Sequence, residues 1–473
     1  MIKSMVEALT QIGPSFKLEP FATIIQPIIQ EALAEHKKDK FRKGTILTPL
    51  LLVWLVLTLS LRRDINYPKT LNWLVSGLRW LCLDLPPKAK LVKDGAISHA
   101  RVKLGVAVFR DIFSSFVLSF TGIKPDFHGL VSAAFDGTGM PMPDTDSNRN
   151  KFGKPKSRGG YGAFPQMRVV ALLVLSARLI FDIAYAPYSG KKTGERSLML
   201  KILEKIKRLD FLFLFDAGFY SFPIAYDMIE NNRKFIMKMS KSVRLTKIKG
   251  SHRPDGSFLA VIKGKIEDPA GSKNGRKKWI KVEITVRVII FQIPGFRPVR
   301  LITTILDPAI TAKEIAIHYH KRWDIEIAYD EIKTHQCATL RGQMPTIIRS
   351  KRPDLVEQEL YAIMITYNLI RSLIYEAASK HGKDPRFISF LDTLQLIIDA
   401  VPFMSNTQND GKNRFDYLLE LIADSPIDRP RRPRINPRVV KVKMSKYKRK
   451  RSGNKSTYRN FEKDIEIITE QAA

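Results

Sequence analysis

The chain has 473 residues, of which 44% are hydrophobic, so it is long enough for roughly two to four domains with buried cores. Lysine and arginine number 79 against 46 aspartate and glutamate, and the formal net charge of +33 favours a polyanionic partner such as nucleic acid. The two cysteines, Cys82 and Cys337, are too few for a disulfide framework or a structural zinc site. We interpret both as packing residues of a protein from a reducing cytoplasm.

The first region, up to about residue 125, has a helical pattern. Its most apolar stretch is Ile46–Leu61, with 16 uncharged residues between basic flanks. A membrane-spanning helix needs about 20 apolar residues, so we expect a buried core helix with Thr48 as N-cap and Pro49 in its first turn. The opening residues lack the apolar stretch of a cleavable signal peptide. We therefore expect no membrane association.

Two further helices are expected in this region, at Leu71–Leu83 and Ser98–Phe120. Ser98 is a candidate N-cap of the second helix, which would place Arg101 near the helix start with its charge toward DNA. A plain helical bundle with exposed charge is an equally consistent interpretation.

The second region, from about residue 126, alternates strands with helices. Two apolar runs end in an acid, VSAAFD at Asp136 and FLFLFD at Asp216. Between them lie the strand candidates MRVVALLVLSA and LIFDIAYAPYS and the helical pattern ERSLMLKILEKIKRL. A lone buried carboxylate is costly, so each acid needs a cation, a metal ion or a donor network. The alternative is an aspartate that caps the next helix. Lys191 and Lys192, near a helix start, are candidate DNA contacts.

The third region, residues 241–305, has the alternating pattern of β-strands. Basic residues gather directly before Trp279, which is a candidate either for an exposed DNA contact or for core packing. A helical region follows, and its clearest member is EQELYAIMITYNLIRSLIYEAA. From Arg429 to Arg459 there are 14 lysine or arginine residues and no acid, which predicts a flexible, polyanion-binding tail.

The segment YHKRWDIEIAYDEIK, between the third region and the helical region, has the most informative spacing. Tyr319, Arg322, Glu326 and Lys333 are three, four and seven residues apart, which places them near one face of an α-helix. Arg322 and Glu326 can pair at i,i+4, which would hold the carboxylate ionised. A solvated, salt-bridged surface helix is the alternative interpretation of the spacing alone.

Together, these motifs resemble those of bacterial insertion-sequence transposases of the IS-four type, which are DDE recombinases. The resemblance lies in an acid followed by Gly-Thr, an acid followed by Ala-Gly-Phe-Tyr-Ser, and the Tyr-(2)-Arg-(3)-Glu-(6)-Lys signature, with 80 and 110 residues between the acids. It implies an α/β, ribonuclease H-like catalytic core with a β-rich insertion, flanked by N-terminal and C-terminal helical regions. The expected segments are 1–125 (DNA-end binding), 126–240 (core), 241–305 (insertion), 306–349 (signature helix), 350–425 (helical) and 426–473 (basic tail).

Carried over to this sequence, the resemblance implies that Asp136, Asp216 and Glu326 bind two Mg²⁺ ions, with Mn²⁺ as a substitute. Two such ions about 3.5–4 Å apart can stabilise the attacking and leaving oxygens of a phosphoryl displacement. The neighbouring acids Asp330 and Glu331 do not fit the signature.

The resemblance also implies the partners and the DNA contacts. Tyr319, Arg322 and Lys333 would contact the DNA end, and Trp279 would stack on a flipped base, with core packing as its alternative. The implied partners are double-stranded DNA, as terminal inverted repeats and target, and a second copy of the chain in a homodimer. The implied reaction cuts the element ends with water and joins the 3′ ends to target DNA, in the bacterial cytoplasm at the nucleoid.

Two alternatives stay open at this level. A different ribonuclease H-like nuclease would share the three acids without strand transfer. A DNA-binding protein that has lost activity would keep the fold and bind without metal-dependent cutting.

Overall fold

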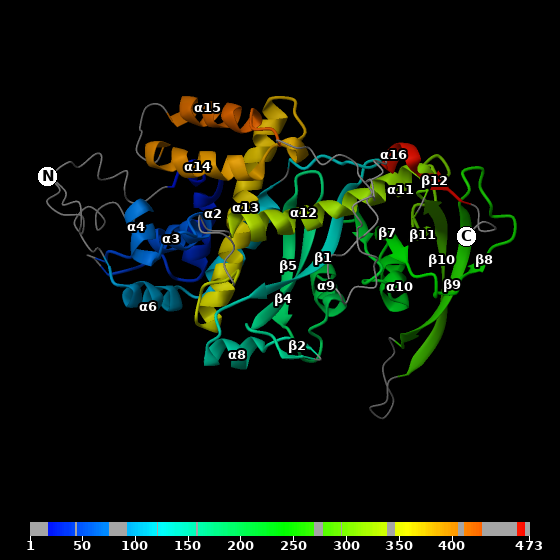
Figure 1. Ribbon diagram of the computed structural model, residues 1–473, viewed down its shortest axis with the longest axis horizontal. Coiled ribbons are helices and arrows are strands. Elements are labelled where there is room, and N and C mark those ends of the chain that lie inside the picture. Colours follow the sequence, from blue (N-terminus) through cyan, green and yellow to red (C-terminus); the bar gives the residue numbers. More distant parts are fainter. Residues whose placement is uncertain are drawn as a thin grey trace, which may run out of the picture. The chain divides into compact units, whose positions relative to one another are not determined.

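The computed structural model describes residues 18–42, 45–74, 92–120, 122–157, 159–268, 278–294, 296–337, 346–404, 411–427 and 461–468. The chain divides into two compact units, and Figure 1 labels the helices and strands of both. The first unit comprises residues 1–124, 137–205 and 325–427, and the second comprises 125–136, 206–324 and 428–473. The helical regions predicted before and after the core therefore both belong to the first unit.

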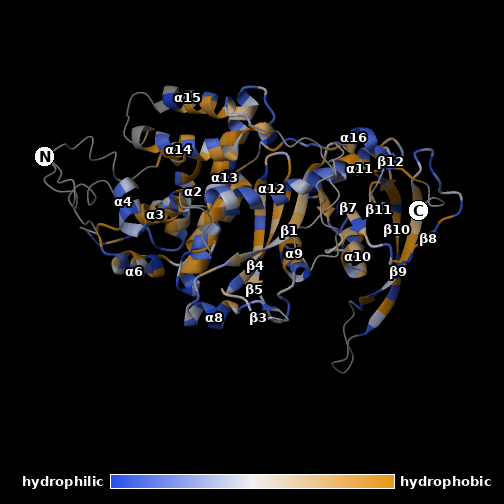
Figure 2. Cartoon of the chain, in the orientation of Figure 1, coloured by the Kyte–Doolittle hydropathy of each residue, from blue (hydrophilic) through white to orange (hydrophobic). Residues whose placement is uncertain are grey.

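The first unit is built around the long helix α13 (Pro353–Lys380), which packs against α3, α7, α14 and α15. The apolar stretch predicted as a core helix is α3 (Pro49–Leu61), and Thr48 caps it by accepting from the Leu51 amide at 3.3 Å. All of its residues after Pro49 are buried, and Figure 2 shows it as a hydrophobic ribbon. No helix among the described residues is both long and apolar enough to cross a membrane. The other helices around α13 are α2 (Ala22–Glu35), α4 (Tyr67–Leu74), α6 (Asp94–Leu104), α7 (Val106–Ser119), α14 (Phe390–Met404) and α15 (Gly411–Ala423).

The helix expected at Ser98–Phe120 is two helices, because the chain breaks between α6 and α7 at Gly105. Gly105 has a φ of +84°, a conformation that glycine adopts without a Cβ penalty. Ser98 is not an N-cap, since it lies inside α6, whose N-cap position is Lys93. Of the helix expected at Leu71–Leu83, α4 covers the start, and the remainder with Cys82 lies outside the described residues.

The first unit also holds a β-hairpin of β4 (Gln166–Val174) and β5 (Leu179–Pro187), which pair antiparallel. Helix α9 (Glu195–Leu203) packs against both strands through its buried Leu198, Met199 and Ile202. The short elements α8 (Asp146–Phe152), β2 (Lys156–Ser157) and β3 (Gly160–Tyr161) precede the hairpin.

The second unit contains the parallel strands of the core. The start of β1 (Val131–Pro141) pairs parallel with β6 (Phe211–Phe215), and β6 pairs parallel with β7 (Lys234–Met239). Every residue of β6 is buried, as a strand covered on both faces requires. In chain order the core therefore runs β1, β4, β5, α9, β6, α10 (Phe222–Glu230) and β7, the order of three strands, helix and strand that the sequence predicts.

The β-rich insertion is not a separate sheet. Its strand β11 (Val299–Thr303) pairs antiparallel with β7, followed outward by β10 (Trp279–Gln292), β9 (Phe258–Glu267) and β8 (Thr246–Lys247). In Figure 1 these strands continue the sheet away from β7, with α10 beside them. Helix α10 contacts both β7 and β9, and the ring of Phe222 lies against Gly264, where a Cβ would meet it at 2.2 Å.

Part of the segment predicted as a flexible tail is ordered. Helix α16 (Phe461–Asp464) and strand β12 (Glu466–Ile467) return to the second unit, where β12 pairs with β10. The ring of Phe461 stacks on His320 with centroids 4.1 Å apart and meets Phe291 edge-on at 5.9 Å. The basic run Arg429–Arg459 lies outside the described residues, as do Lys273, Arg276 and Lys277 of the insertion.

Candidate active site

Two of the three predicted catalytic acids lie side by side in the second unit. Strand register pairs Ala134 of β1 with Leu214 of β6, and Leu214 with Ile236 of β7. Two residues further along the same parallel register lie Asp136, Asp216 and Lys238, which we call the strand-end row. Residues two apart in a strand share a face, so the row projects on one side, where the parallel pairing of β1 with β6 ends.

The strand-end row is open to solvent while the strands that carry it are buried. Asp136 is half-buried, and the side chain of Asp216 keeps 42% of its exposure. The ammonium of Lys238 lies 3.9 Å from the Asp216 carboxylate. Below the row, Phe135 stacks on Phe213 and Phe215 with centroids 5.9 and 5.5 Å apart. The aromatic packing thus fixes the backbone from which the two acids project.

The first strand does not end at its acid, as the sequence suggested, but continues to Pro141. Thr138 lies on the same face of β1 as Asp136, and Gly137 lies on the opposite face, where a Cβ would meet the side chain of Glu195 at 2.5 Å. In the first unit, the ammonium of Lys333 donates a hydrogen bond to the Thr138 hydroxyl. The signature lysine therefore lies over the face of β1 on which Thr138 projects.

The signature segment is helical throughout but is not one regular α-helix. It comprises α11 (Ala312–His320), a 3-10 turn (Lys321–Trp323), α12 (Asp324–Asp330) and a π-helical turn (Glu331–Gln336). The 3-10 turn tightens and the π turn widens the spacing of a regular helix, so the uniform stripe predicted from the spacing is only approximate. π turns of this kind are frequent at functional sites.

Helix α11 is anchored to the strand ends of the second unit. The hydroxyl of the signature residue Tyr319 donates to the carbonyl of Phe215, directly before Asp216, at 3.0 Å. One residue earlier, the His318 ring lies 2.5 Å from the Ser132 hydroxyl of β1. Tyr319 is 7% and Arg322 5% exposed, and the Arg322 guanidinium lies 5.2 Å from the Trp323 ring centre. These two side chains are thus covered by protein rather than held on an exposed DNA-facing surface.

Glu326, the third predicted acid, lies in α12 of the first unit and is half-buried. The structure accordingly brings together Asp136 and Asp216 in one unit, and Lys333 and Thr138 in the other. Glu326 belongs to the same unit as Lys333 and Thr138.

The two neighbouring acids have different surroundings. Asp330 is exposed and accepts from Thr334 at 2.8 Å. Glu331 is buried and accepts from Arg178 at 3.3 Å, from Tyr367 at 3.0 Å and from Arg371 at 3.0 Å. Burial and then the Glu331 charge raise the pKa of Tyr367; burial acts to lower the pKa of Arg371, but Glu331 more than offsets it. Glu331 therefore ties the π turn to α13 and to the β4–β5 hairpin.

The predicted DNA contacts outside the signature divide into exposed and buried residues. Lys191 and Lys192 are exposed beside the start of α9, as a phosphate contact requires. Arg101 is only 1% exposed, and its guanidinium donates to Gln358, the Tyr67 hydroxyl and the Leu355 carbonyl. The prediction that Arg101 faces DNA is corrected, because its charge is used to join α6 to α13.

Trp279 is 53% exposed at the far end of β10, so the core-packing interpretation is wrong. It lies nine residues before Val288, which stands in register with Ile302 of β11 and, through it, Met237 of β7. Nine residues span about 30 Å of strand. A base bound at the strand-end row is therefore too distant to stack on Trp279.

The donors of the site suit a hard divalent cation. Asp136 and Asp216 stand on adjacent strands, about 4.8 Å apart, and carboxylate oxygens are the ligands that Mg²⁺ and Mn²⁺ prefer. Among the described residues, no group of three or more His, Cys, Asp or Glu side chains is close enough to form a metal site by itself. The two aspartates would thus supply part of a ligand set, which water or DNA would complete.

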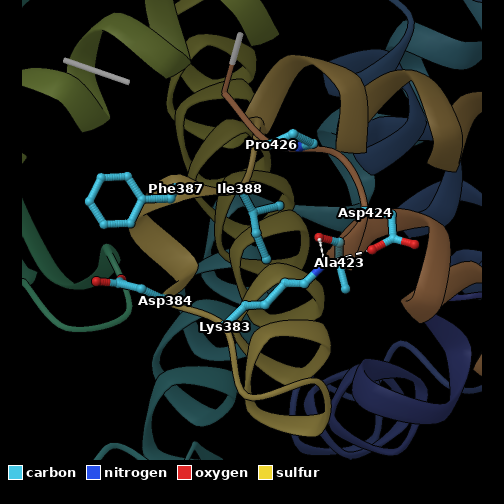
Figure 3. A pocket seen from close by; sticks show the side chains of 7 residues that line it. All are labelled: Lys383, Asp384, Phe387, Ile388, Ala423, Asp424 and Pro426. Atoms are coloured by element: carbon cyan, nitrogen blue, oxygen red, sulfur yellow. Dashed lines mark hydrogen bonds and ion pairs between the residues drawn. The ribbon is translucent and has the colours of Figure 1, made fainter. Parts of the chain in front are cut away.

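A separate pocket of about 450 Å³ lies in the first unit between the ends of α13 and α15 (Figure 3). Its lining residue Lys383 donates to the Ala423 carbonyl at 2.9 Å and to Asp424 at 2.6 Å. None of the predicted site residues lines this pocket, so it is not part of the candidate active site.

Comparison with known families decides the class of protein. The family model described as "Transposase DDE domain" matches residues 129–369, half of the chain and all three predicted acids. This chain belongs to the DDE transposases. A second model, "Insertion element 4 transposase N-terminal", matches residues 17–114. The α/β, ribonuclease H-like core is thereby confirmed, and the protein is an enzyme of DNA strand cleavage and strand transfer that uses divalent metal ions.

Similar proteins of Escherichia coli are also described as transposases. It is 28% identical to "Transposase InsG for insertion sequence element IS4" of Escherichia coli (strain K12) over 432 residues, which cover 89% of this chain and 91% of that protein. It is 27% identical to "Putative transposase InsZ" of the same organism over 159 residues, 32% of this chain and 52% of that protein. Among solved structures, a piggyBac transposase synaptic complex with hairpin DNA matches with a TM-score of 0.40 and 12% identity, covering 86% of this chain and 84% of that one.

Two residues of this site went unnoticed in the sequence. Thr138 belongs to the motif of the first acid but had no role assigned to it, and Lys238, in the strand after the second acid, has no motif of its own. The alternation of β1 and the register of β6 with β7 are what identify them.

Proposed function

We propose that this transposase binds the terminal inverted repeats of its element, cleaves them by metal-dependent hydrolysis and joins the 3′ ends to target DNA in a cut-and-paste reaction. The observation that carries the proposal is the strand-end row, which sets Asp136 beside Asp216 where the parallel pairing of β1 with β6 ends. Ligands of open α/β sheets gather at such ends. We assign Glu326 as the third acid because it occupies the signature position.

The roles of the residues follow from their chemistry. Asp136, Asp216 and Glu326 would hold Mg²⁺, or Mn²⁺ in its place, as two ions. Bound ions of this kind supply charge stabilisation at the attacking and leaving oxygens and help to form a hydroxide nucleophile from water. Lys333 is assigned to a phosphate of the DNA end, with its ammonium oriented by Thr138. The reaction needs no covalent intermediate with the protein, because water and then the 3′-OH serve as nucleophiles.

Other contacts extend the DNA path. Lys191 and Lys192 are assigned to phosphates, as point charges on an exposed loop. Trp279 is assigned to DNA about 30 Å from the cleaved bond, close to one turn of a B-form duplex. We further propose that the transposase works as a homodimer on paired ends, in the bacterial cytoplasm where chromosomal DNA lies.

The test is Mg²⁺-dependent cleavage of a labelled duplex that carries the element's own end. Asp136→Asn, Asp216→Asn and Glu326→Gln should each bind the duplex but cut it about 10³-fold more slowly, the equivalent of several kcal/mol of lost charge stabilisation. Asp330→Asn, an exposed acid one turn along the same helix, is the matched control and should cut normally. Cutting by all three variants at the wild-type rate would refute the site.

Strand transfer separates the proposal from a simple nuclease. A pre-cleaved end with a free 3′-OH is incubated with a supercoiled target plasmid and Mg²⁺. Joined products support the transposase mechanism, whereas cleavage without any joining would favour the nuclease alternative.

A further inference from the structure

We propose that Lys238 is a phosphate-binding residue of the active site, held by Asp216 until DNA arrives. The inference rests on the proposed function and adds a residue to it. Lys238 is the third member of the strand-end row and comes from β7, the strand next to β6, which ends directly before Asp216. Its ammonium lies 3.9 Å from the Asp216 carboxylate.

The position of Lys238 in its strand favours a functional role. The neighbours Met237 and Met239 are buried on the other face of β7, and Leu301, opposite Lys238 on β11, is also buried. Lys238 is thus a partly exposed cation near the carboxyl end of β7, beside buried apolar residues, with 42% of its side chain exposed. Lys234, at the amino end of the same strand, is exposed and has no acid of the row beside it.

The charges of the row explain what Lys238 does. An exposed ion pair at this distance contributes only about 0–1 kcal/mol to stability, so the pair is not needed to hold the fold. It is weak enough to exchange partners. A divalent cation on Asp216 would compete for the same carboxylate, and the freed ammonium would then lie within reach of a DNA phosphate at the strand ends. Lysine suits this exchange because its compact ammonium on a long stem can change partners without a fixed geometry.

The exchange predicts two effects of opposite sign in Lys238→Met. Loss of one phosphate contact should weaken binding of the element-end duplex about 5-fold at roughly 0.15 M salt and reduce the slope of log K against log salt by about 0.9. Loss of the competing cation should tighten Mn²⁺ binding to the DNA-free protein by about 2- to 5-fold. Lys238→Arg should preserve both wild-type values, since the charge remains.

The experiment measures duplex binding by fluorescence anisotropy in Ca²⁺, across a salt series, and Mn²⁺ binding to the DNA-free protein by electron paramagnetic resonance. Lys234→Met on the same strand is the matched control, and thermal unfolding checks that each variant is folded. Equal DNA affinity in Lys238→Met and wild type, or an equal loss in Lys234→Met, would overturn the proposal. Unchanged Mn²⁺ affinity would contradict the pairing with Asp216. Wild-type protein that does not prefer the element end over random duplex would instead refute the proposed function.

Discussion

Glu331→Gln tests whether buried contacts of Glu331 hold the π turn of the signature segment in place. The Glu331 carboxylate accepts from two guanidinium groups and one phenol, and the side chains of Glu331, Arg178 and Arg371 are 8%, 6% and 1% exposed. Glutamine keeps the shape but removes the negative charge, and its amide turns a donor toward groups that are themselves donors.

The structure sets the size of the effect. Removing one partner of a buried ion pair costs about 3–5 kcal/mol, because the remaining charge stays buried without compensation. Here two arginines lose the same partner, so we expect the free energy of unfolding of the first unit to fall by about 3–5 kcal/mol. Tyr367→Phe removes only one hydrogen bond to the carboxylate and should cost about 1.5–3 kcal/mol.

Urea unfolding followed by circular dichroism measures the loss, and hydrogen exchange locates it. The amides of the π turn and of α13 should exchange faster in Glu331→Gln. Asp330→Asn, which changes an exposed acid one residue away, should alter stability by less than about 0.5 kcal/mol. A loss below about 1 kcal/mol in Glu331→Gln would refute the anchoring role.

Three further perturbations test other contacts. Thr138→Val should weaken end binding in the wild type by about 2- to 5-fold and have no effect in a Lys333→Ala background, because the hydroxyl acts through that ammonium; additive losses in this double-mutant cycle would contradict it. Arg101→Met should lower the unfolding temperature while the affinity of the folded protein for DNA stays unchanged, and a selective loss of DNA affinity would reinstate Arg101 as a contact. Burial lowers the pKa of His320 below 6.5, with Arg322 adding to the effect and Asp324 and Glu462 opposing it. The stacking of Phe461 on His320 should therefore be fully stable above about pH 6.5 and weaken as the pH falls through the lower folded-state pKa. Proteolysis of the C-terminal segment at about pH 7.5 and 5.5 measures this loss, and His320→Phe should abolish the pH dependence.

Local signals predicted the elements well where burial agrees with pattern. Three elements were predicted from their local sequence alone: β6 from its apolar run, the β9–β10 pair from its alternation, and the start of α3 from its Thr48 cap. The order of strands and helices followed from these signals, and so did the position of Asp216 directly after β6, whereas β1 continues past Asp136.

The features that escaped prediction depend on contacts distant in sequence. The π turn after α12 coincides with the pairing of Glu331 to Arg178 and Arg371, 153 and 40 residues away. Arg101 looked like a surface cation because its partners in α13 lie more than 250 residues further on. Composition alone likewise grouped residues 461–468 with the basic run, although Phe461 and Ile465 are buried.

The strands of the insertion are hydrogen-bonded to the core sheet, so β10 sets a fixed distance between Trp279 and the strand-end row. From Val288 to Trp279 the strand is paired with β9 at every step, so its tip cannot move relative to the strand ends without bending the sheet. Inserting two residues into β10 between Trp279 and Val288 would lengthen the strand by about 7 Å and keep Trp279 on the same face of the sheet. Inserting one residue would turn Trp279 to the opposite face. Related transposases with a β10 of different length should therefore differ by pairs of residues. Each added pair would shift the contact of Trp279 along the duplex by about two base pairs.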